Sequence, residues 1–297
     1  MGELRILHME KPLAKKNIIL TGASRGLGRC IAASLAAKGA NLLLVARDRA
    51  LLEAVQEQLN AGGLTGQEMH MTAVDLRSAN AVETIVHAAT RVWDTLDVLI
   101  NNAAILGPIG PVWENNWSDW QETILVNLTV PVALCRACIP WMQAGGGGKI
   151  INLSGGGATA SRPNFTAYAV AKTGLVRFTE IAAAETKPLS IEVNCVAPGA
   201  LNTDMLQDVL NVGPEKVGEQ EYAQALKQSE SGGANPEGAA ELCAFLASSA
   251  SDGISGKLIS ALWDPWRALP AHVSSLESSD IYTLRRIVPK DRNMDWG

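Results

Sequence analysis

Seven short apolar segments alternate with longer segments of helical spacing, and this alternation limits the fold more than any other feature of the sequence. The apolar segments are residues 17–20, 40–45, 69–74, 97–101, 149–153, 191–196 and 257–262. They are almost continuously apolar, which is typical of strands that are buried on both faces. Helix-length segments such as ALLEAVQEQL lie between them. The sequence therefore predicts an α/β fold with a doubly wound parallel sheet of about seven strands.

The repeating pattern ends near residue 262, which predicts a single domain over 1–262 and a C-terminal extension over 263–297. Pro265 and Pro270 prevent a continuous helix at the start of the extension. Its later part is too apolar for a solvated tail, and it also carries a basic cluster. The apolar residues are Leu276, Ile281, Tyr282, Leu284 and Trp296, and the basic residues are Arg285, Arg286, Lys290 and Arg292. The extension is expected to pack on its own domain, to cross to a neighbouring subunit, or to contribute to substrate binding.

Charge and composition exclude several classes of function. The formal net charge is −5 and the sequence pI is about 5.5, so no nucleic-acid partner is expected. The first sixteen residues scatter acidic and basic side chains, and no apolar window reaches membrane-spanning length, so we expect a cytoplasmic protein without a membrane partner. Cys135 and Cys138 form a CxxC on an expected helix without a second pair, which indicates buried thiols and no metal site.

The first apolar segment runs directly into the glycine-rich turn TGASRGLG, residues 21–28. In a turn from a strand to a helix, Gly22 allows the sharp bend, while Gly26 and Gly28 allow backbone and helix to approach a pyrophosphate. The phosphate would lie at the N-terminus of the following helix. Because the turn follows the first strand of a repeating βα pattern, it indicates dinucleotide binding.

Together with this turn, NNAA (101–104), Asn127 within VNL, YAVAK (168–172) and PGALNT (198–203) resemble, in order and spacing, the classical short-chain dehydrogenase/reductase family. The resemblance covers roughly residues 13–260. It implies one Rossmann-type domain, NAD or NADP as cofactor, a small-molecule carbonyl or alcohol substrate, and a homodimer or homotetramer. The cofactor contacts that it implies are Gly22, Ser24, Arg25, Gly26, Leu27, Gly28, Arg47, Asp75, Leu76, Asn101, Ala103, Tyr168, Lys172, Pro198, Gly199 and Thr203.

Tyr168 and Lys172 are four positions apart, so they share one face of a helix. An ammonium below a phenol favours the ionised form and would lower the phenol pKa from about 10 toward neutrality. The family resemblance implies that Tyr168 is the acid and base. It also implies a second role for Lys172, which is to hold the nicotinamide ribose. Asn127 resembles the family asparagine that interrupts a helix and holds a water for proton relay.

The serine is where this chain departs from the family pattern. The family serine stands about thirteen positions before the tyrosine, and that position is Gly155 here. Ser154 precedes it and would face the opposite way in a regular strand. Two explanations stay open: the glycines at 155–157 turn Ser154 into the site, or Tyr168 acts with a backbone N–H or a water. We slightly favour Ser154, and Thr159 and Ser161 are weaker substitutes.

The end of the second strand, LLLVARDR, predicts a preference for NADP. Ala46 stands where an acidic residue would bind the ribose of NAD, and Arg47 follows it. Arg25 projects from the glycine turn, so two guanidinium groups can hold one 2′-phosphate. NAD remains possible, and Asp75 resembles the residue that meets the adenine edge.

The resulting hypothesis is an NADP-dependent oxidoreductase that transfers a hydride between nicotinamide and a carbonyl or alcohol. A catalytically weak or inactive dinucleotide-binding protein is the alternative, because Gly155 replaces the usual serine, and a lyase or isomerase is a third possibility. Residues 204–235 are expected to form a mobile substrate loop. The stripe of Trp113, Trp117 and Trp120 indicates core or subunit contact, and Trp263 and Trp266 mark a departure from the family near the substrate.

Overall fold

The computed structural model describes residues 11–62 and 66–296. Its centre is a single parallel sheet of seven strands in the order β3-β2-β1-β4-β5-β6-β7. The strands are β1 (Asn17–Thr21), β2 (Asn41–Ala46), β3 (Met69–Ala73), β4 (Val98–Asn101), β5 (Gly148–Leu153), β6 (Ile191–Ala197) and β7 (Leu258–Ser260). This architecture confirms the predicted doubly wound fold, and each strand lies within an expected apolar segment or within one residue of its ends.

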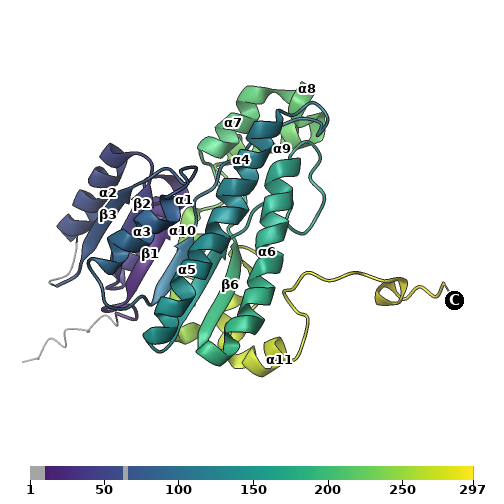
Figure 1. Cartoon of the computed structure of the whole chain (residues 1–297). Coiled ribbons are helices and arrows are strands. Elements are labelled where there is room, and N and C mark those ends of the chain that lie inside the picture. Colours follow the sequence, from purple (N-terminus) through teal and green to yellow (C-terminus); the bar gives the residue numbers. More distant parts are fainter. Residues whose placement is uncertain (1–10, 63–65, 297) are drawn as a thin grey trace, which may run out of the picture.

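Helices cover both faces of the sheet (Figure 1). The α-helices are α1 (Gly26–Ala37), α2 (Arg49–Gly62), α3 (Ala81–Thr90), α4 (Trp117–Ile124), α5 (Val130–Ala144), α6 (Thr166–Thr186), α7 (Asp204–Val212), α8 (Pro214–Val217), α9 (Glu219–Ser231), α10 (Pro236–Ala247) and α11 (Val273–Glu277). A π-helical segment, η1 (Leu125–Thr129), joins α4 to α5. Short 3-10 turns are η2 (Lys187–Leu189), η3 (Ser249–Ser251), η4 (Trp266–His272) and η5 (Pro289–Arg292).

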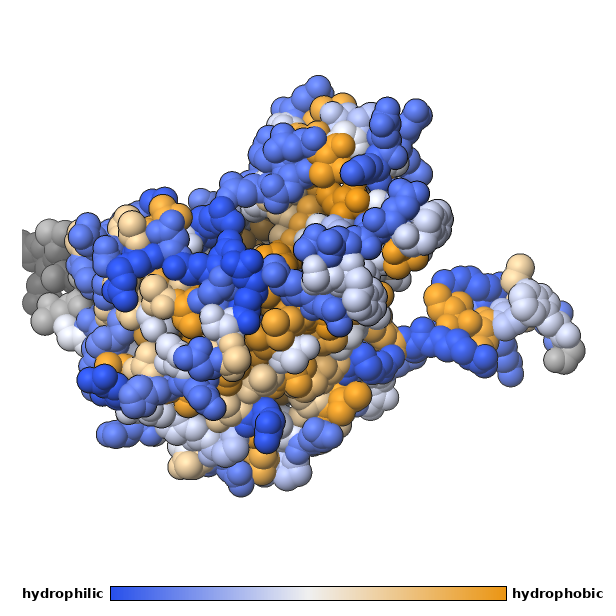
Figure 2. Space-filling model, turned by 45° about the horizontal axis from the view of Figure 1, so that its top comes forward, coloured by the Kyte–Doolittle hydropathy of each residue, from blue (hydrophilic) through white to orange (hydrophobic). Residues whose placement is uncertain are grey.

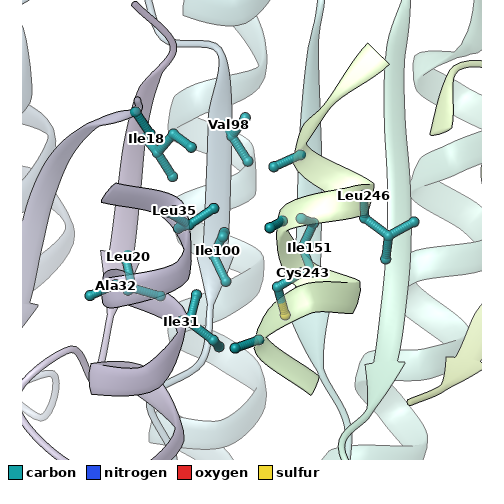
Figure 3. Packing of buried hydrophobic residues seen from close by; sticks show 14 of the residues in the cluster. Ile18, Leu20, Ile31, Ala32, Leu35, Val98, Ile100, Ile151, Cys243 and Leu246 are labelled. Carbon is teal, nitrogen blue, oxygen red and sulfur yellow. The ribbon is translucent and has the colours of Figure 1, made fainter. Parts of the chain in front are cut away.

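Alternate residues of each strand feed two separate hydrophobic layers. Ile18 and Leu20 of β1 pack with α1, α2 and α10, whereas Ile19 between them packs with α3, α5 and α6. Figure 3 shows the first layer, in which Leu35 of α1 and Leu246 of α10 lie over strands β1, β4 and β5. Because both layers exclude water, all three of these β1 side chains are fully buried, which explains the continuous apolar segments of the sequence.

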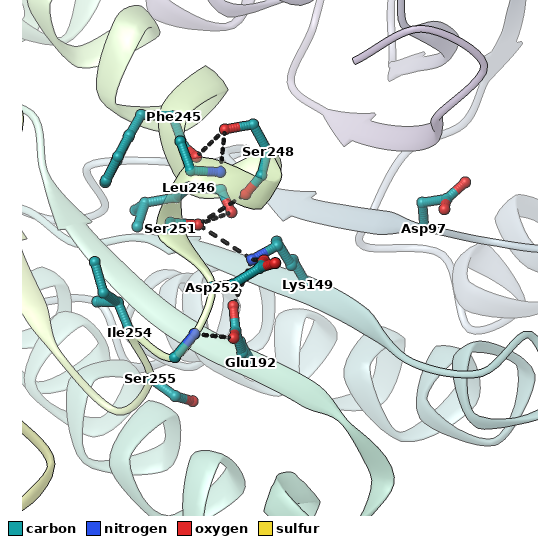
Figure 4. Close-up of polar contacts among 12 residues, drawn as sticks. Asp97, Lys149, Glu192, Phe245, Leu246, Ser248, Ser251, Asp252, Ile254 and Ser255 are labelled. Atoms are coloured by element: carbon teal, nitrogen blue, oxygen red, sulfur yellow. Dashed lines mark hydrogen bonds and ion pairs between the residues drawn. The ribbon is translucent and has the colours of Figure 1, made fainter. Parts of the chain in front are cut away.

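Ion pairs join strands β5 and β6 near their amino ends (Figure 4). Lys149 Nζ lies 2.5 Å from Glu192 Oε2 and 2.8 Å from Asp252 Oδ1, and it also donates to the Ser251 hydroxyl. Lys149 is largely shielded from water, so these pairs matter more than ordinary surface contacts. They connect the sheet to the turn after α10.

Helices α4, η1 and α5 continue into one another from Trp117 to Ala144. By length and composition this run could span a membrane, but 44% of its most apolar stretch is buried within the protein. Leu134, Cys135, Cys138 and Met142 pack into the second hydrophobic layer, as expected for a core helix. The CxxC pair is therefore buried and free, as predicted, and burial raises the pKa of both thiols. No metal-binding cluster of His, Cys, Asp or Glu occurs within residues 11–62 and 66–296.

The two tryptophan groups behave differently. Trp113 and Trp117 are exposed, and Trp117 stacks on Trp120 with ring centroids 5.0 Å apart, so this stripe does not belong to the subunit's own core. Trp266 is buried against Phe245, whereas Trp263 is exposed. The pair in ALWDPW therefore separates into one core residue and one surface residue.

The C-terminal extension packs on its own domain as far as Leu284. Trp266, Leu269 and Leu276 are buried in the first hydrophobic layer. The backbone amide of Leu284 donates to Glu180 of α6, and the carbonyl of Tyr282 accepts from Leu258 of β7. Beyond Leu284 the chain extends away from the body (Figures 1 and 2). We call residues 285–296 the terminal arm; its exposed apolar side chains are Ile287, Met294 and Trp296.

Candidate active site

The turn between β1 and α1 requires glycine at two positions for steric reasons. Gly22 has φ +68°, and a Cβ there would lie 2.8 Å from the Cα of Ala103. A Cβ at Gly28 would lie only 1.9 Å from the carbonyl oxygen of Gly22. Both contacts are shorter than real Cβ contacts, and both involve backbone atoms that cannot move independently. The glycines therefore allow β1, α1 and the segment after β4 to meet.

Helix α1 presents unsatisfied backbone amides to the same region. Arg25 precedes the helix in an extended conformation, and no side chain caps the first turn. Exposed N–H groups and the helix dipole form a suitable site for a phosphate anion. The local structure thus fits the diphosphate of a dinucleotide, as the motif predicted.

A cavity of about 1090 Å³ runs along the carboxyl ends of the strands, from this turn to the segment after β5. Figure 2, turned to bring this end of the molecule forward, shows a hollow beneath the projecting helices. Most of the predicted site residues line it: Gly22, Ser24, Arg25, Gly26, Leu27, Gly28, Arg47, Asp75, Leu76, Ala103, Ser154, Tyr168, Lys172, Pro198, Gly199 and Thr203. The fold therefore brings together residues from both halves of the sequence.

Basic and acidic side chains surround the end of the cavity beside β2 and β3. Arg47 is exposed at the end of β2, and Asp48 accepts from the amide of Leu51, where it caps α2. Asp75 forms an ion pair of 2.6 Å with Arg77, whose hydrogen bonds hold the pKa of the carboxyl below its usual value, with a smaller contribution from Arg47. Arg77 also lines the cavity and was missed, although it stands only two positions after Asp75.

Arg25 forms an ion pair with an acidic residue of α7. Its guanidinium lies 2.5 Å from the carboxylate of Asp204, the first residue of α7, and both side chains are largely exposed. Such exposed pairs contribute little to stability. Arg25 can therefore exchange this partner for a phosphate, and the predicted joint contact of Arg25 and Arg47 with a 2′-phosphate stays a prediction.

The amide predicted at position 101 is not in the cavity. Asn101 Nδ2 donates to Asn152 Oδ1 at 2.9 Å, inside the sheet. The next residue, Asn102, lines the cavity instead and donates to the carbonyls of Thr21 and Gly22. Successive side chains at the end of β4 point to opposite faces of the sheet, so Asn102 and not Asn101 faces the glycine turn.

Asn127 lies within the π-helical segment η1, so the expected interruption of the helix is present. Its side chain is fully buried and pairs with Ile105, accepting from the amide at 2.9 Å and donating to the carbonyl at 2.7 Å. It does not line the cavity. The side chain therefore fixes the segment after β4, and the proposed water relay could involve only its backbone.

Tyr168 and Lys172 lie on one face of α6, as predicted, at the base of the cavity. Both are buried, and Lys172 Nζ lies 5.7 Å from the Tyr168 ring centroid while donating to the Leu153 carbonyl at 2.7 Å. Burial lowers the pKa of Lys172 to about 8. Burial raises the pKa of Tyr168 to about 12, and the opposing charge is that of Arg162. The expected fall of the phenol pKa toward neutrality is therefore wrong for this structure, because desolvation dominates.

Gly155 lies directly beside the Tyr168 hydroxyl. A Cβ at this glycine would be 2.3 Å from Tyr168 Oη, so the phenol occupies the place that the family serine would need. Ser154 lines the cavity, but its Oγ is buried and has no hydrogen-bond partner in the described part of the chain. Within the described residues no hydrogen bond joins Ser154 to Tyr168, so our slight preference for Ser154 stays a prediction.

The segment expected as a loop over 204–235 forms helices α7, α8 and α9. Leu206, Val209, Val217 and Ala225 pack with Phe165 and Tyr168 in a small hydrophobic cluster, which explains the helical structure. Polar residues of the same helices face the cavity. Arg162, Glu221, Gln224, Gln228 and Trp263 also line the cavity and were not predicted as site residues. The helical spacing of apolar residues in 204–231 could have predicted these helices from the sequence.

The fold and the cavity define a Rossmann-type dinucleotide-binding protein whose cavity contains a buried tyrosine and lysine. The family model described as short chain dehydrogenase matches residues 16–211. This chain belongs to the short-chain dehydrogenase/reductase family. It is accordingly an NAD(P)-dependent oxidoreductase of the class that acts on CH–OH and C=O groups.

Known relatives align over most of the chain. Human dehydrogenase/reductase SDR family member 4 is 30% identical over 250 residues, which cover 84% of this chain and 86% of the relative. The 3-oxoacyl-[acyl-carrier-protein] reductase FabG of Chlamydia trachomatis is 31% identical over 248 residues, covering 84% and 96%. The structure of L-sorbose reductase from Gluconobacter frateurii, complexed with NADPH and L-sorbose, superposes with a TM-score of 0.75 and 27% identity, covering 85% and 97%.

Proposed function

We propose that this protein is an NADP-dependent oxidoreductase that interconverts a carbonyl and an alcohol, with Tyr168 as the acid and base. The observation that supports this most directly is the single cavity that joins the glycine turn of α1 to the Tyr168–Lys172 pair. When bound, NADPH supplies a hydride to the carbonyl carbon, or NADP⁺ accepts one from the alcohol carbon.

The chain's own groups handle the proton. With a pKa of about 12, the Tyr168 phenol is neutral at pH 7 and holds the proton that a carbonyl oxygen must receive. Lys172 has a pKa of about 8, so its ammonium form predominates at pH 7 and contributes positive charge beside the phenol. We also assign Lys172 the role of holding the nicotinamide ribose. The neutral phenol suits the reductive direction.

The preference for NADP is supported by the charges near β2. Ala46 leaves no carboxylate at the strand end, and Arg47 is exposed at the cavity wall. Arg25 and Arg77 are the other guanidinium groups of this region, and each forms an ion pair with a carboxylate. Solved relatives include one in complex with NADPH and one from Beutenbergia cavernae with bound NADP.

NADPH is expected to bind at least about tenfold tighter than NADH, a difference of about 1.4 kcal/mol that one charged contact can supply. Arg47→Asp is expected to remove or reverse this preference, because the carboxylate would repel a 2′-phosphate and accept from a ribose hydroxyl. Fluorescence titration with both cofactors measures it. Arg49→Asp makes the same charge change on α2 outside the cavity and should leave the ratio unchanged. Equal affinities in the unaltered protein would refute the proposal.

The substrate class is tested with a panel of small carbonyl and alcohol compounds, followed by NADPH absorbance. Named relatives act on different compounds, including trans-4-hydroxycyclohexanecarboxylate and 3-oxoacyl-[acyl-carrier-protein], so the panel must include cyclic, acidic and thioester-linked ketones. Turnover with any of them supports the proposal.

We also propose a cytoplasmic homodimer or homotetramer. Its main domain would span residues 1–262, with residues 263–297 as an extension that packs on that domain and, through the terminal arm, on a neighbouring subunit. The exposed Trp113, Trp117, Val170 and Ile181 provide further apolar surface for such contacts. Sedimentation measures the assembly.

A catalytically weak dinucleotide-binding protein is the second candidate, because Gly155 and the high phenol pKa depart from the family pattern. Tight NADPH binding without turnover on the whole panel would favour it. A lyase or isomerase would show turnover without change in NADPH absorbance.

A further inference from the structure

Side chains pack closely against the three glycines at 155–157. A Cβ at Gly155 would be 2.3 Å from Tyr168 Oη, and one at Gly156 would be 3.3 Å from Arg162 Nη1. A Cβ at Gly157, which has φ +89°, would be 2.7 Å from the Cβ of Ala169. Neighbouring glycines thus contact the Tyr168 hydroxyl and the Arg162 guanidinium, and both residues line the same cavity.

Arg162 is held in a defined orientation. Its Nε donates to Glu221 Oε1 at 2.8 Å, and Nη2 donates to the same oxygen. The guanidinium carbon lies 3.9 Å from the ring centroid of Phe165, a buried residue just before α6. One carboxylate and one aromatic face therefore fix the plane of the group, which reduces the entropy lost when it binds a ligand.

The remaining nitrogen of this guanidinium is available. Within residues 11–62 and 66–296, Arg162 Nη1 donates no hydrogen bond, and it is the side-chain atom nearest the Gly156 Cβ position. The Arg162 side chain is only 21% exposed, so its charge acts in a partly desolvated environment. Glu221 comes from α9, so the packing of α7–α9 over the cavity is what supplies this carboxylate.

We propose that Arg162 donates a hydrogen bond from Nη1 to the reacting substrate oxygen, in the role that the serine hydroxyl has elsewhere in the family, and that Glu221 positions it. This inference rests on the proposed function. During reduction the carbonyl oxygen gains negative charge as hydride reaches the carbon, and it then takes the proton of Tyr168 Oη. A guanidinium beside that oxygen stabilises the developing charge, as a preorganised donor should. Arg162 also opposes the raised pKa of the phenol.

The first test compares steady-state kinetics of Arg162→Met with Ser154→Ala. Arg162→Met keeps most of the side-chain volume and removes every donor, so kcat should fall about a hundredfold or more, the scale expected for loss of an oxyanion donor. Arg162→Lys should recover part of this loss. Ser154→Ala should change kcat less than about threefold, because its hydroxyl is buried. Arg49→Met is the control for a general loss of positive charge.

Two kinetic results would contradict the proposed role of Arg162. A hundredfold loss in Ser154→Ala with an active Arg162→Met would overturn the proposal and restore Ser154. If Arg162→Met instead raises KM for acidic substrates and leaves kcat unchanged, Arg162 recognises a substrate anion and is not the oxyanion donor.

A second measurement does not depend on turnover. The chain has three tyrosines, so 13C-labelled tyrosine allows the Tyr168 phenol to be titrated by NMR in the cofactor-free protein. The charged groups near it are Lys172 on its own helix, Arg162 on the preceding segment and, through Arg162, Glu221 on α9. Arg162→Met should move the midpoint to higher pH. An unchanged midpoint would contradict the proposal even if no substrate had been found, whereas a shifted midpoint without turnover in the wild type would count against the proposed function alone.

Discussion

Tyr168→Phe is expected to lower kcat at least about a thousandfold, because it removes the only atom of the side chain that can transfer a proton. The ring remains, so its packing with Phe165, Leu206 and Ala225 is preserved. Lys172 keeps its contact with the Leu153 carbonyl and remains available to the ribose. The NADPH dissociation constant should therefore change less than about threefold, and the loss should appear in kcat and kcat/KM together.

Tyr222→Phe is the matched control for this experiment. Tyr222 belongs to α9 and packs on the edge of the same hydrophobic cluster, but it does not line the cavity. Its loss of a hydroxyl should leave kcat nearly unchanged. If Tyr168→Phe retained more than a tenth of the wild-type kcat, another group would have to provide the proton, and the proposed mechanism would be wrong.

The fold could be read from the sequence because burial on both faces leaves a local signal. Strand β1 sends Ile18 and Leu20 to one layer and Ile19 to the other, so all three of these positions must be apolar. The glycine turn is local in part, since Gly28 is required by a backbone contact within the same βα unit, whereas Gly22 is required by the Ala103 backbone after β4. Both features can be recognised without knowing which helices pack together.

The electrostatics of the site could not be read in this way. The spacing of Tyr168 and Lys172 predicts that they share a helix face, but the pKa of the phenol depends on its burial, and the cluster around it draws residues from distant parts of the sequence. Glu221 reaches Arg162 across 59 positions of the sequence. Position 155 was recognised as a departure from the family, yet only the structure shows that the Tyr168 hydroxyl fills that place.

The serine question shows the same limit. Strand alternation argued that Ser154 faces away from the phenol, and the glycine run argued that the backbone could turn it back. The structure has positive φ at Gly157 but at neither Gly155 nor Gly156, so the chain turns after the serine has already been buried. The local sequence permits both arrangements, and the kinetics of Ser154→Ala decide between them.

Truncation after Ala261 is expected to unfold the protein, although the sequence presents residues 263–297 as an appendage. Trp266, Leu269 and Leu276 are each about 5% exposed or less and belong to the layer formed with α1 and α10. Removing one such side chain typically costs about 2–5 kcal/mol, and whole domains have only about 5–15 kcal/mol of stability. Loss of all three should therefore abolish the cooperative thermal transition measured by circular dichroism.

Truncation after Leu284 is the matched variant, because it removes only the terminal arm. It preserves the buried side chains, the Leu284–Glu180 hydrogen bond and the contact of Tyr282 with β7, so the melting temperature and NADPH affinity should stay close to those of the full chain. Arg285 pairs with Asp280 and Asp291, which reduces the net positive charge of the arm and leaves Ile287, Met294 and Trp296 as its main exposed apolar groups. If these side chains bind a neighbouring subunit, sedimentation should show a smaller assembly after this truncation. An unchanged sedimentation coefficient, beyond the small loss of mass, would exclude the arm as a subunit contact.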